Sequence, residues 1–254
     1  MKGMRGRRRR GQILVIAAFG MAIVLLSTQA YIYKVSRGHV SSGYDSLGDY
    51  VLSVKLGSEH AVTASVINVS NGGATANLGD NLDRWETFVA GDYRFGRCDL
   101  NSTLASQSPY SQGIWLDWGT DGVGVSSACS DFTLNMSGRG VEVDLSYEAN
   151  VTTSVLVSGS YSDLGGDSKA VTVIVNLYNE GTPALENSST LAYLRSGSWE
   201  DPTVLGDYSA LDYGNGTYLY TFTDTVLGIQ APVRVQAYDL RGVFVQAEAT
   251  LTEG

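Results

Sequence analysis

The N-terminal end constrains this chain more than any other feature, because a basic stretch runs directly into a long apolar one. Four arginines, Arg7 to Arg10, are followed by 23 residues without a formal charge, Gly11 to Tyr33. An apolar helix of about 20 residues crosses the hydrocarbon layer of a bilayer. Positive charges at one end of such a helix hold that end in the cytoplasm. The sequence therefore predicts a transmembrane helix at 12–36 that contacts membrane lipid and exports the rest of the chain.

Three processing fates are open for this segment. It can remain as a membrane anchor. It can be removed as a secretory signal peptide, since Thr28-Gln-Ala30 has the small residues that such a cleavage site needs. It can also be cut between the basic leader and the apolar helix. All three place the body outside the cytoplasm, either anchored by the helix or released, in one case into a surface filament.

The third fate comes from a resemblance. The short leader 1–11, the sequence Arg10-Gly11-Gln12 and the apolar helix directly after it resemble the class III signal of archaeal type IV pilins. In that family a membrane peptidase cuts after a Gly, which implies a cut between Gly11 and Gln12. Many pilins carry an acidic residue five positions into the mature helix, where this chain has Ile16. The resemblance implies assembly with copies of itself or with other pilin-like subunits.

The rest of the chain is acidic and rich in sequons. Residues 38–254 hold 9 of the 17 basic residues and all 26 acidic ones, which gives a net charge of −17. Such a body repels nucleic acid, so we expect no nucleic-acid partner. Six sequons offer N-glycosylation acceptors: Asn68, Asn101, Asn135, Asn150, Asn187 and Asn215. They predict a glycoprotein surface, although Ser/Thr-rich strands also produce such sequences by chance.

Two cysteines and two histidines limit the remaining chemistry. In an exported chain, a lone pair such as Cys98 and Cys129 is most simply a disulfide. That bridge would close a loop of about 30 residues and stabilise the fold by about 3–4 kcal/mol. His39 and His60 each stand alone in a polar context, and no CxxC occurs. The sequence therefore predicts neither a metal site nor a cofactor from these residues.

Two helices are expected at the start of the exported body. Residues 45–69 keep a helical period and stop at Asn71-Gly-Gly73, and a second helix runs from Asn77 to a stop at Gly91. Their predicted core-packing stripes are Leu47, Val51, Val54, Ser58 and Ala61 in the first, and Leu78, Leu82, Trp85 and Val89 in the second. Gly57 weakens the expectation of an unbroken first helix.

From about residue 114 the hydrophobic period changes to two. Strands are predicted at 132–136, 141–145 and 151–157. Residues 37–160 therefore form helices packed on an antiparallel sheet in this interpretation. A long N-terminal helix followed by a β-rich head is also the general layout of pilin-like subunits. The polar, Gly-rich segment 161–168 is predicted to be a linker.

Residues 169–254 have the pattern of a small β-sandwich. The first strand alternates at Val171, Val173, Val175 and Leu177, and further strands are predicted at 190–194, 217–223, 233–238 and 243–251. The segments 212–218 and 235–242 resemble the paired-strand segments of Ig-like domains on prokaryotic surface proteins. The predicted fold class is α+β: a transmembrane helix, helices packed on an antiparallel sheet, and a C-terminal Ig-like β-sandwich.

No catalytic motif is present, since the sequence has no nucleophile motif, P-loop or HExxH. Carboxylates do gather in loops, at Asp117 and Asp121, Asp163 and Asp167, and Asp207 and Asp212. Calcium prefers such ligands, but the spacing fits no calcium-binding loop and Asp is common in turns. Trp115, Trp118 and Trp199 could stack on sugar rings, although Trp on strands more often packs in a core.

These observations lead to three hypotheses. The first is a non-enzymatic cell-surface protein, a pilin-like filament subunit or adhesin held by its N-terminal helix. The second is a solitary anchored or secreted module that binds surface carbohydrate or protein. The third is a secreted hydrolase with a carboxylate pair, whose two groups the sequence alone does not bring together.

Overall fold

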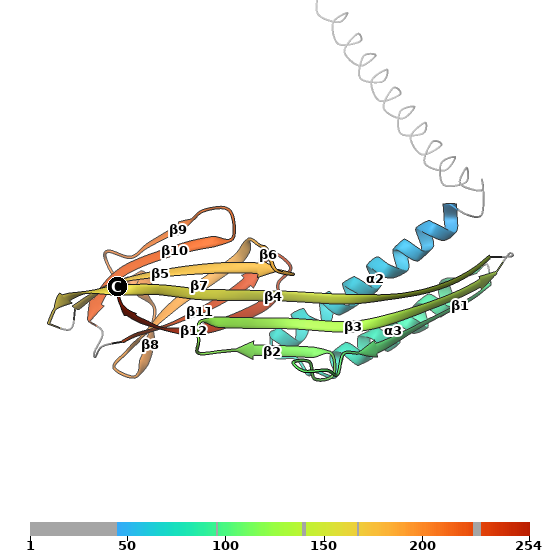
Figure 1. Cartoon of the computed structure of the whole chain (residues 1–254), viewed down its shortest axis with the longest axis horizontal. Helices are drawn as coiled ribbons and strands as arrows, with labels where there is room; N and C mark the ends of the chain where they lie inside the picture. The colour runs from blue at the N-terminus through green and yellow to red at the C-terminus, as the bar shows by residue number, and fades with distance from the viewer. Residues whose placement is uncertain (1–44, 95, 139–140, 167, 226–229) are drawn as a thin grey trace, which may run out of the picture. The chain divides into compact units, whose positions relative to one another are not determined.

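The fold is α+β, as predicted: two helices are followed by a large, mixed, curled sheet (Figure 1). The computed structural model describes residues 45–94, 96–138, 141–166, 168–225 and 230–254. The leader, the cleavage sequence Arg10-Gly11-Gln12 and the predicted transmembrane helix lie outside the described residues. Among the helices that are described, none has the length and apolarity needed to cross a bilayer. The chain divides into two compact units, 1–54 and 55–254, and the second contains the whole sheet.

Both helices begin and end close to the predicted residues. Helix α2 spans Asp45–Ser70 and helix α3 spans Asn77–Asp92. In α3 the buried side chains are Leu78, Leu82 and Val89, which belong to the predicted stripe. In the part of α2 from residue 55 onward, burial continues through Ser58, Val62, Ser65, Val66 and Val69. Gly72 has a φ of +93°, which explains why the first helix stops at the Gly pair.

Gly57 does not interrupt α2 but admits the ring of Trp85 from α3. A Cβ atom at residue 57 would lie 2.1 Å from Cζ2 of that indole. Trp85 Nε1 donates to the Oγ of Ser58 at 3.0 Å, and the same hydroxyl lies 2.8 Å from Tyr147 Oη on the sheet. The Trp85 N–H and the hydroxyls of Ser58 and Tyr147 therefore all have hydrogen-bond partners where the two helices meet the sheet. The glycine is a packing requirement.

The described strands form one hydrogen-bonded sheet. They are β1 (Arg97–Leu104), β2 (Ile114–Trp118), β3 (Val123–Gly138), β4 (Val141–Gly165), β5 (Ser168–Asn179), β6 (Thr182–Pro183), β7 (Glu186–Arg195), β8 (Ser198–Glu200), β9 (Ser209–Asp212), β10 (Thr217–Thr225), β11 (Ala231–Asp239) and β12 (Phe244–Glu253). The order is β8-β7-β11-β12-β4-β5-β10-β9, with β3 also on β4, β1 and β2 on β3, and β6 on β5. The pairing is antiparallel except between β12 and β4, where Thr252 and Glu253 run parallel to Ser160 and Tyr161. A short 3₁₀ helix, η1 (Pro202–Val204), follows β8.

Strand β4 joins the two parts of the sheet without a break. Its residues 141–156 pair with β3, while residues 153–165 pair with β5. The strand has 25 residues, a length of about 80 Å at the usual rise per residue. Within the segment 161–168, predicted to be a linker, residues 161–165 end β4 and Ser168 begins β5. The polar, Gly-rich composition belongs to the turn from β4 into β5, where Gly165 and Gly166 have φ of +91° and +61°.

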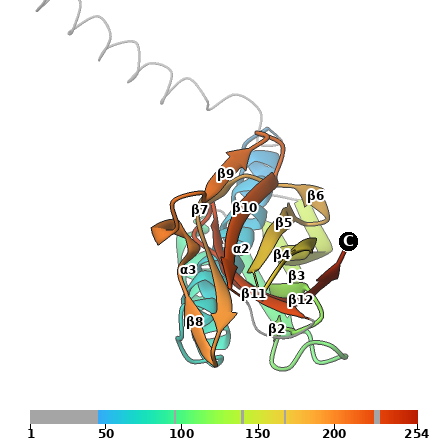
Figure 2. The same ribbon diagram turned by 90° about the vertical axis from the view of Figure 1, so that its left-hand side faces the viewer.

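The curl of the sheet encloses its own core. Val171, Val173, Val175 and Leu177 of β5 are all buried, as their alternation predicts. They belong to one cluster with inward residues of β4, β7, β10, β11 and β12. Figure 2 looks toward this end of the sheet, where β7 lies beside β10 although β11, β12, β4 and β5 separate them in the strand order.

A buried carboxylate fixes the turn between β11 and β12 to β4. The side chain of Asp239 is fully buried. It accepts hydrogen bonds from Thr153 Oγ1 at 2.9 Å and from Arg241 Nε at 2.7 Å. The backbone N–H of Val243 donates to its other oxygen at 2.9 Å. The charge is therefore paired and hydrogen-bonded, which is the condition for keeping a carboxylate inside a protein.

Candidate functional site

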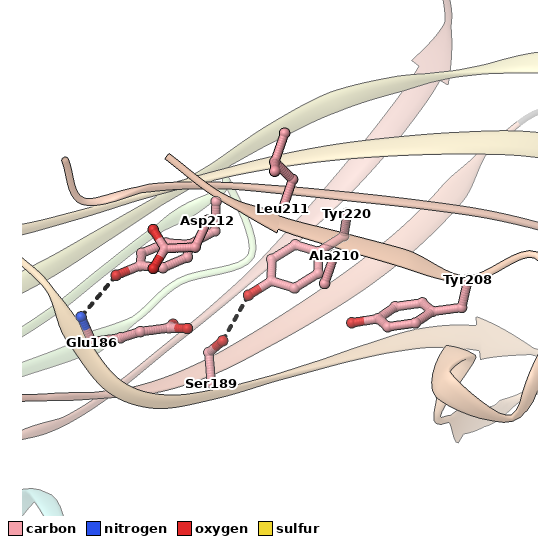
Figure 3. A pocket seen from close by; sticks show the side chains of 8 residues that line it. Glu186, Ser189, Tyr208, Ala210, Leu211, Asp212 and Tyr220 are labelled. Carbon is pink, nitrogen blue, oxygen red and sulfur yellow. Dashed lines mark hydrogen bonds between the residues drawn. The ribbon is translucent and has the colours of Figure 1, made fainter. Parts of the chain in front are cut away.

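Tyrosine hydroxyls bridge β7 and β10, which share no backbone ladder. Tyr218 Oη accepts from the backbone N–H of Glu186 at 2.8 Å. Tyr220 Oη lies 2.7 Å from Ser189 Oγ, and the Tyr193 hydroxyl donates to the carboxylate of Asp224 (Figure 3 shows the first two bonds). The alternation of β10 turns its two tyrosines inward. We call this line of contacts the β7–β10 seam.

A pocket of about 250 Å³ opens at one end of the seam. It is lined by Glu186, Ser189, Tyr208, Ala210, Leu211, Asp212, Tyr218 and Tyr220 (Figure 3). Tyr218 and Tyr220 are 3% and 6% exposed and form its inner wall, whereas the β9 residues are exposed and form its rim. At about 30 Å³ per water molecule in the liquid, this volume equals that of roughly eight waters, which is room for a small ligand.

Aromatic rings make up much of the inner surface. The rings of Tyr208 and Tyr220 lie 6.4 Å apart at an interplanar angle of 27°. Burial raises the pKa of Tyr220 to about 12, although its hydrogen bond with Ser189 acts in the opposite direction. Burial likewise raises the pKa of Tyr208 and of Tyr218. At neutral pH all three rings are therefore uncharged.

The charge of the pocket comes from two carboxylates. Burial raises the pKa of Glu186, a hydrogen bond from Ser189 lowers it, and the negative charge of Asp212 raises it again. None of the eight lining residues is Lys, Arg or His. The pocket thus combines π-faces with uncompensated negative charge. This arrangement suits a cation or a stacked ring, and it repels an anion.

All six sequon asparagines are exposed, namely Asn68, Asn101, Asn135, Asn150, Asn187 and Asn215. Asn101, Asn135 and Asn150 lie on β1, β3 and β4, on the face of the sheet opposite the helices, because their neighbours in the alternation are buried on the helix side. The side-chain oxygen of Asn68 accepts from Asn77 at the start of α3. Exposure is a condition for glycosylation, and these positions remain predicted acceptors.

Two of these positions are close in sequence to residues that line the pocket. Asn187 directly follows Glu186 on β7, and Asn215 lies in the turn between β9 and β10, three residues after Asp212. The side-chain oxygen of Asn215 accepts from the backbone N–H of Thr217 at 3.1 Å, which shapes the turn.

The structure does not form the predicted Cys98–Cys129 disulfide: both cysteines are buried, and no bond joins them. The register of β1 with β3 places Cys98 opposite Met136, seven residues along β3 from Cys129. At about 3.3 Å per residue that separation is about 23 Å, whereas a disulfide needs Cα atoms within about 7 Å. Strand β1 was not predicted from the sequence, and its register with β3 keeps the two cysteines apart. Burial, followed by the charges of Glu148 and Asp131, raises the pKa of Cys129 to about 11.

The acidic loops have turn-forming roles where their contacts are described. Asp121, Asp163 and Asp212 each accept a hydrogen bond from a backbone N–H two residues later. Across the described ranges, no three His, Cys, Asp or Glu residues gather in a way that could hold a metal ion. Trp118 donates to Ser126 and packs edge-on against Phe244, an arrangement typical of a packed strand residue.

No protein-family model matches the chain, and no curated protein matches it. The pocket was not foreseen from the sequence, because it is assembled from β7, β9, β10 and the turn before β9. The signal that could have marked it is Tyr218-Leu-Tyr220, two tyrosines on one inward face of a strand.

Proposed function

We propose that this chain is a non-enzymatic cell-surface protein whose N-terminal helix tethers or assembles it and whose C-terminal strands form an Ig-like binding module. The strand order is the observation that supports the Ig-like binding module. In Ig-type sandwiches, strands A-B-E-D form one sheet and C-F-G, often with C′, form the other. Here β4-β5-β10-β9 correspond to A-B-E-D, and β8-β7-β11-β12 correspond to C′-C-F-G. The short parallel pairing of β12 with β4 lies between the first and last strands of that order.

The arrangement of helices and strands in residues 55–160, which we call the head, supports the pilin-like part of the proposal. From residue 55, α2 contacts β4 through Ser58 and Tyr147, and α3 packs against β1. A helix-covered antiparallel sheet after an apolar segment is the layout that the pilin resemblance implies. The six exposed sequons are consistent with a surface outside the cytoplasm. The continuous strand β4 would transmit force from the head to the module directly.

The mature N-terminus tests the mode of tethering. Mass spectrometry of the protein from its native membranes should find a chain that begins at Gln12. The variant Gly11→Val should keep the leader, because the peptidase needs a small residue at the cut. The matched variant Gly3→Val, in the same leader, should be processed normally. A chain that begins at Tyr31 would exclude a filament subunit, and an intact leader would leave a simple anchored protein.

The pocket favours the solitary binding module as a second candidate. A filament subunit needs only its helix and its head for assembly, and neither requires a charged, aromatic pocket on the far module. The pocket is a specific observation in favour of recognition of a small group. Both candidates share the exported Ig-like module, so they differ in the N-terminus and not in the site.

A further inference from the structure

The pocket at the end of the β7–β10 seam has a chemistry that selects among ligands. Its two carboxylates, Glu186 and Asp212, face no basic lining residue, and its walls are the rings of Tyr208, Tyr218 and Tyr220. A positively charged group near a tyrosine face is attracted by the ring quadrupole, and the attraction grows as water is excluded. Carboxylates beside such a ring add a direct charge interaction.

We propose that this pocket binds an alkylammonium group, either on a small molecule or as the lysine side chain of a partner protein. The proposal deepens the binding role given to the Ig-like module and is independent of how the N-terminus is processed. Recognition would place the ammonium group between Glu186 and Asp212, with its methyl or methylene groups against the tyrosine rings. No bond is made or broken, and no other group is required.

The hydrogen bonds of the seam argue against a sugar as the main ligand. The hydroxyls of Tyr218 and Tyr220 already contact the Glu186 N–H and the Ser189 hydroxyl. A sugar ring needs several directed hydrogen bonds in addition to stacking, and those hydroxyls are committed to closing the seam. An ammonium group needs only the ring faces and the carboxylates. Asp212 accepts from the Gly214 N–H and Glu186 from Ser189, and each carboxylate keeps further lone pairs for a cation.

The size of the pocket also fits. A volume of about 250 Å³ holds a trimethylammonium group or the end of a lysine side chain, whereas pockets for larger ligands span about 300–1,000 Å³. A ligand as small as choline, with few heavy atoms to contribute, is expected to bind with a Kd on the order of 1 mM. A lysine presented by a folded partner would gain affinity from the surrounding surface.

Calorimetric titration of the full-length chain in maltoside micelles tests the proposal. The probes are choline and Nα-acetyl-lysine methylamide, each paired with a neutral counterpart of nearly the same shape: 3,3-dimethylbutan-1-ol and the Nε-acetylated lysine derivative. We expect saturable binding of at least one cation and none of its neutral counterpart. Choline alone would indicate a small-molecule or headgroup ligand, and the lysine probe alone would indicate a protein partner.

Variants distinguish binding at the pocket from binding elsewhere on the surface. Glu186→Gln and Tyr208→Leu should each weaken binding about tenfold, which is the range of one charge or one cation–π contact in a partly desolvated site. Glu142→Gln removes an exposed carboxylate from β4, and Tyr213→Leu removes an exposed aromatic side chain that does not line the pocket. Both controls should bind as the parent does. Thermal unfolding of every variant shows whether a loss of binding reflects a loss of fold.

Three results would overturn the proposal: no heat of binding with either cation, equal binding of a cation and its neutral counterpart, or full binding by a folded Glu186→Gln variant. Any of them would leave the result for the mature N-terminus unchanged. A failed ligand assignment is therefore distinguishable from a failed assignment of the protein as a tethered surface module.

Discussion

The helix-covered part of the sheet and the β7–β10 seam hold two layers of the structure together in different ways. Between the two helices, the Trp85 ring packs closely against Gly57, and the Ser58 hydroxyl joins Trp85 to Tyr147 on the sheet. At the seam, tyrosine hydroxyls reach across, and the space left at one end is a pocket. Close packing leaves no room for a ligand. Bridging by long polar side chains leaves space between the strands. The candidate site therefore lies in the C-terminal part of the sheet.

The largest expected effect comes from filling the space at Gly57. In Gly57→Leu, the new side chain must displace the Trp85 ring and break its hydrogen bond to Ser58, so we expect a loss of about 3 kcal/mol in the free energy of unfolding. The control is Gly48→Leu in the same helix, where no atom lies within 4 Å of the added Cβ. That control should be neutral or stabilising by up to about 1 kcal/mol. Urea denaturation measures both, and equal effects would mean that the helices are not closely packed at Gly57.

Alkaline pH should weaken the seam by a smaller amount. The pKa of Tyr220 is about 12 in the folded protein because of burial, whereas an unfolded tyrosine titrates near 10. Between these values the unfolded chain has lost the proton that the folded chain retains, so stability falls as pH rises from 10 to 12. A pKa difference of two units between the folded and unfolded states corresponds to about 2.7 kcal/mol.

The variant Tyr220→Phe tests the origin of that loss. It should lower stability near pH 8 by about 1 kcal/mol, through the lost contact with Ser189. It should also make the decline above pH 10 less steep, while the raised pKa values of Tyr193 and Tyr218 keep part of it. Tyr213→Phe, at a position that is 55% exposed, should leave the decline unchanged. Denaturant midpoints measured at pH 8, 10, 11 and 12 compare the three proteins. An equally steep decline in Tyr220→Phe would show that other groups cause it.

The same contrast explains which parts of the structure were predictable. Helices α2 and α3 and strand β5 bury one face, so their apolar residues repeat with the period of the element. Strand β9 has no buried residue and therefore no alternation to detect. The segment 161–168 has the composition of a linker because turns and linkers favour the same residues. The pocket depends on which strands, distant in sequence, curl toward each other. Local sequence patterns do not predict such long-range contacts.

The cysteines give the smallest expected effect and the clearest test of the strand register. A disulfide between Cys98 and Cys129 would contribute about 3–4 kcal/mol, and a reducing agent would remove that contribution. In the observed register the thiols are far apart, so dithiothreitol should leave the urea midpoint unchanged. Both thiols should react with a maleimide only after unfolding, since both are buried. A reductant-dependent midpoint would mean that β1 pairs with β3 in another register, and the close packing of this part of the sheet would then need a different arrangement.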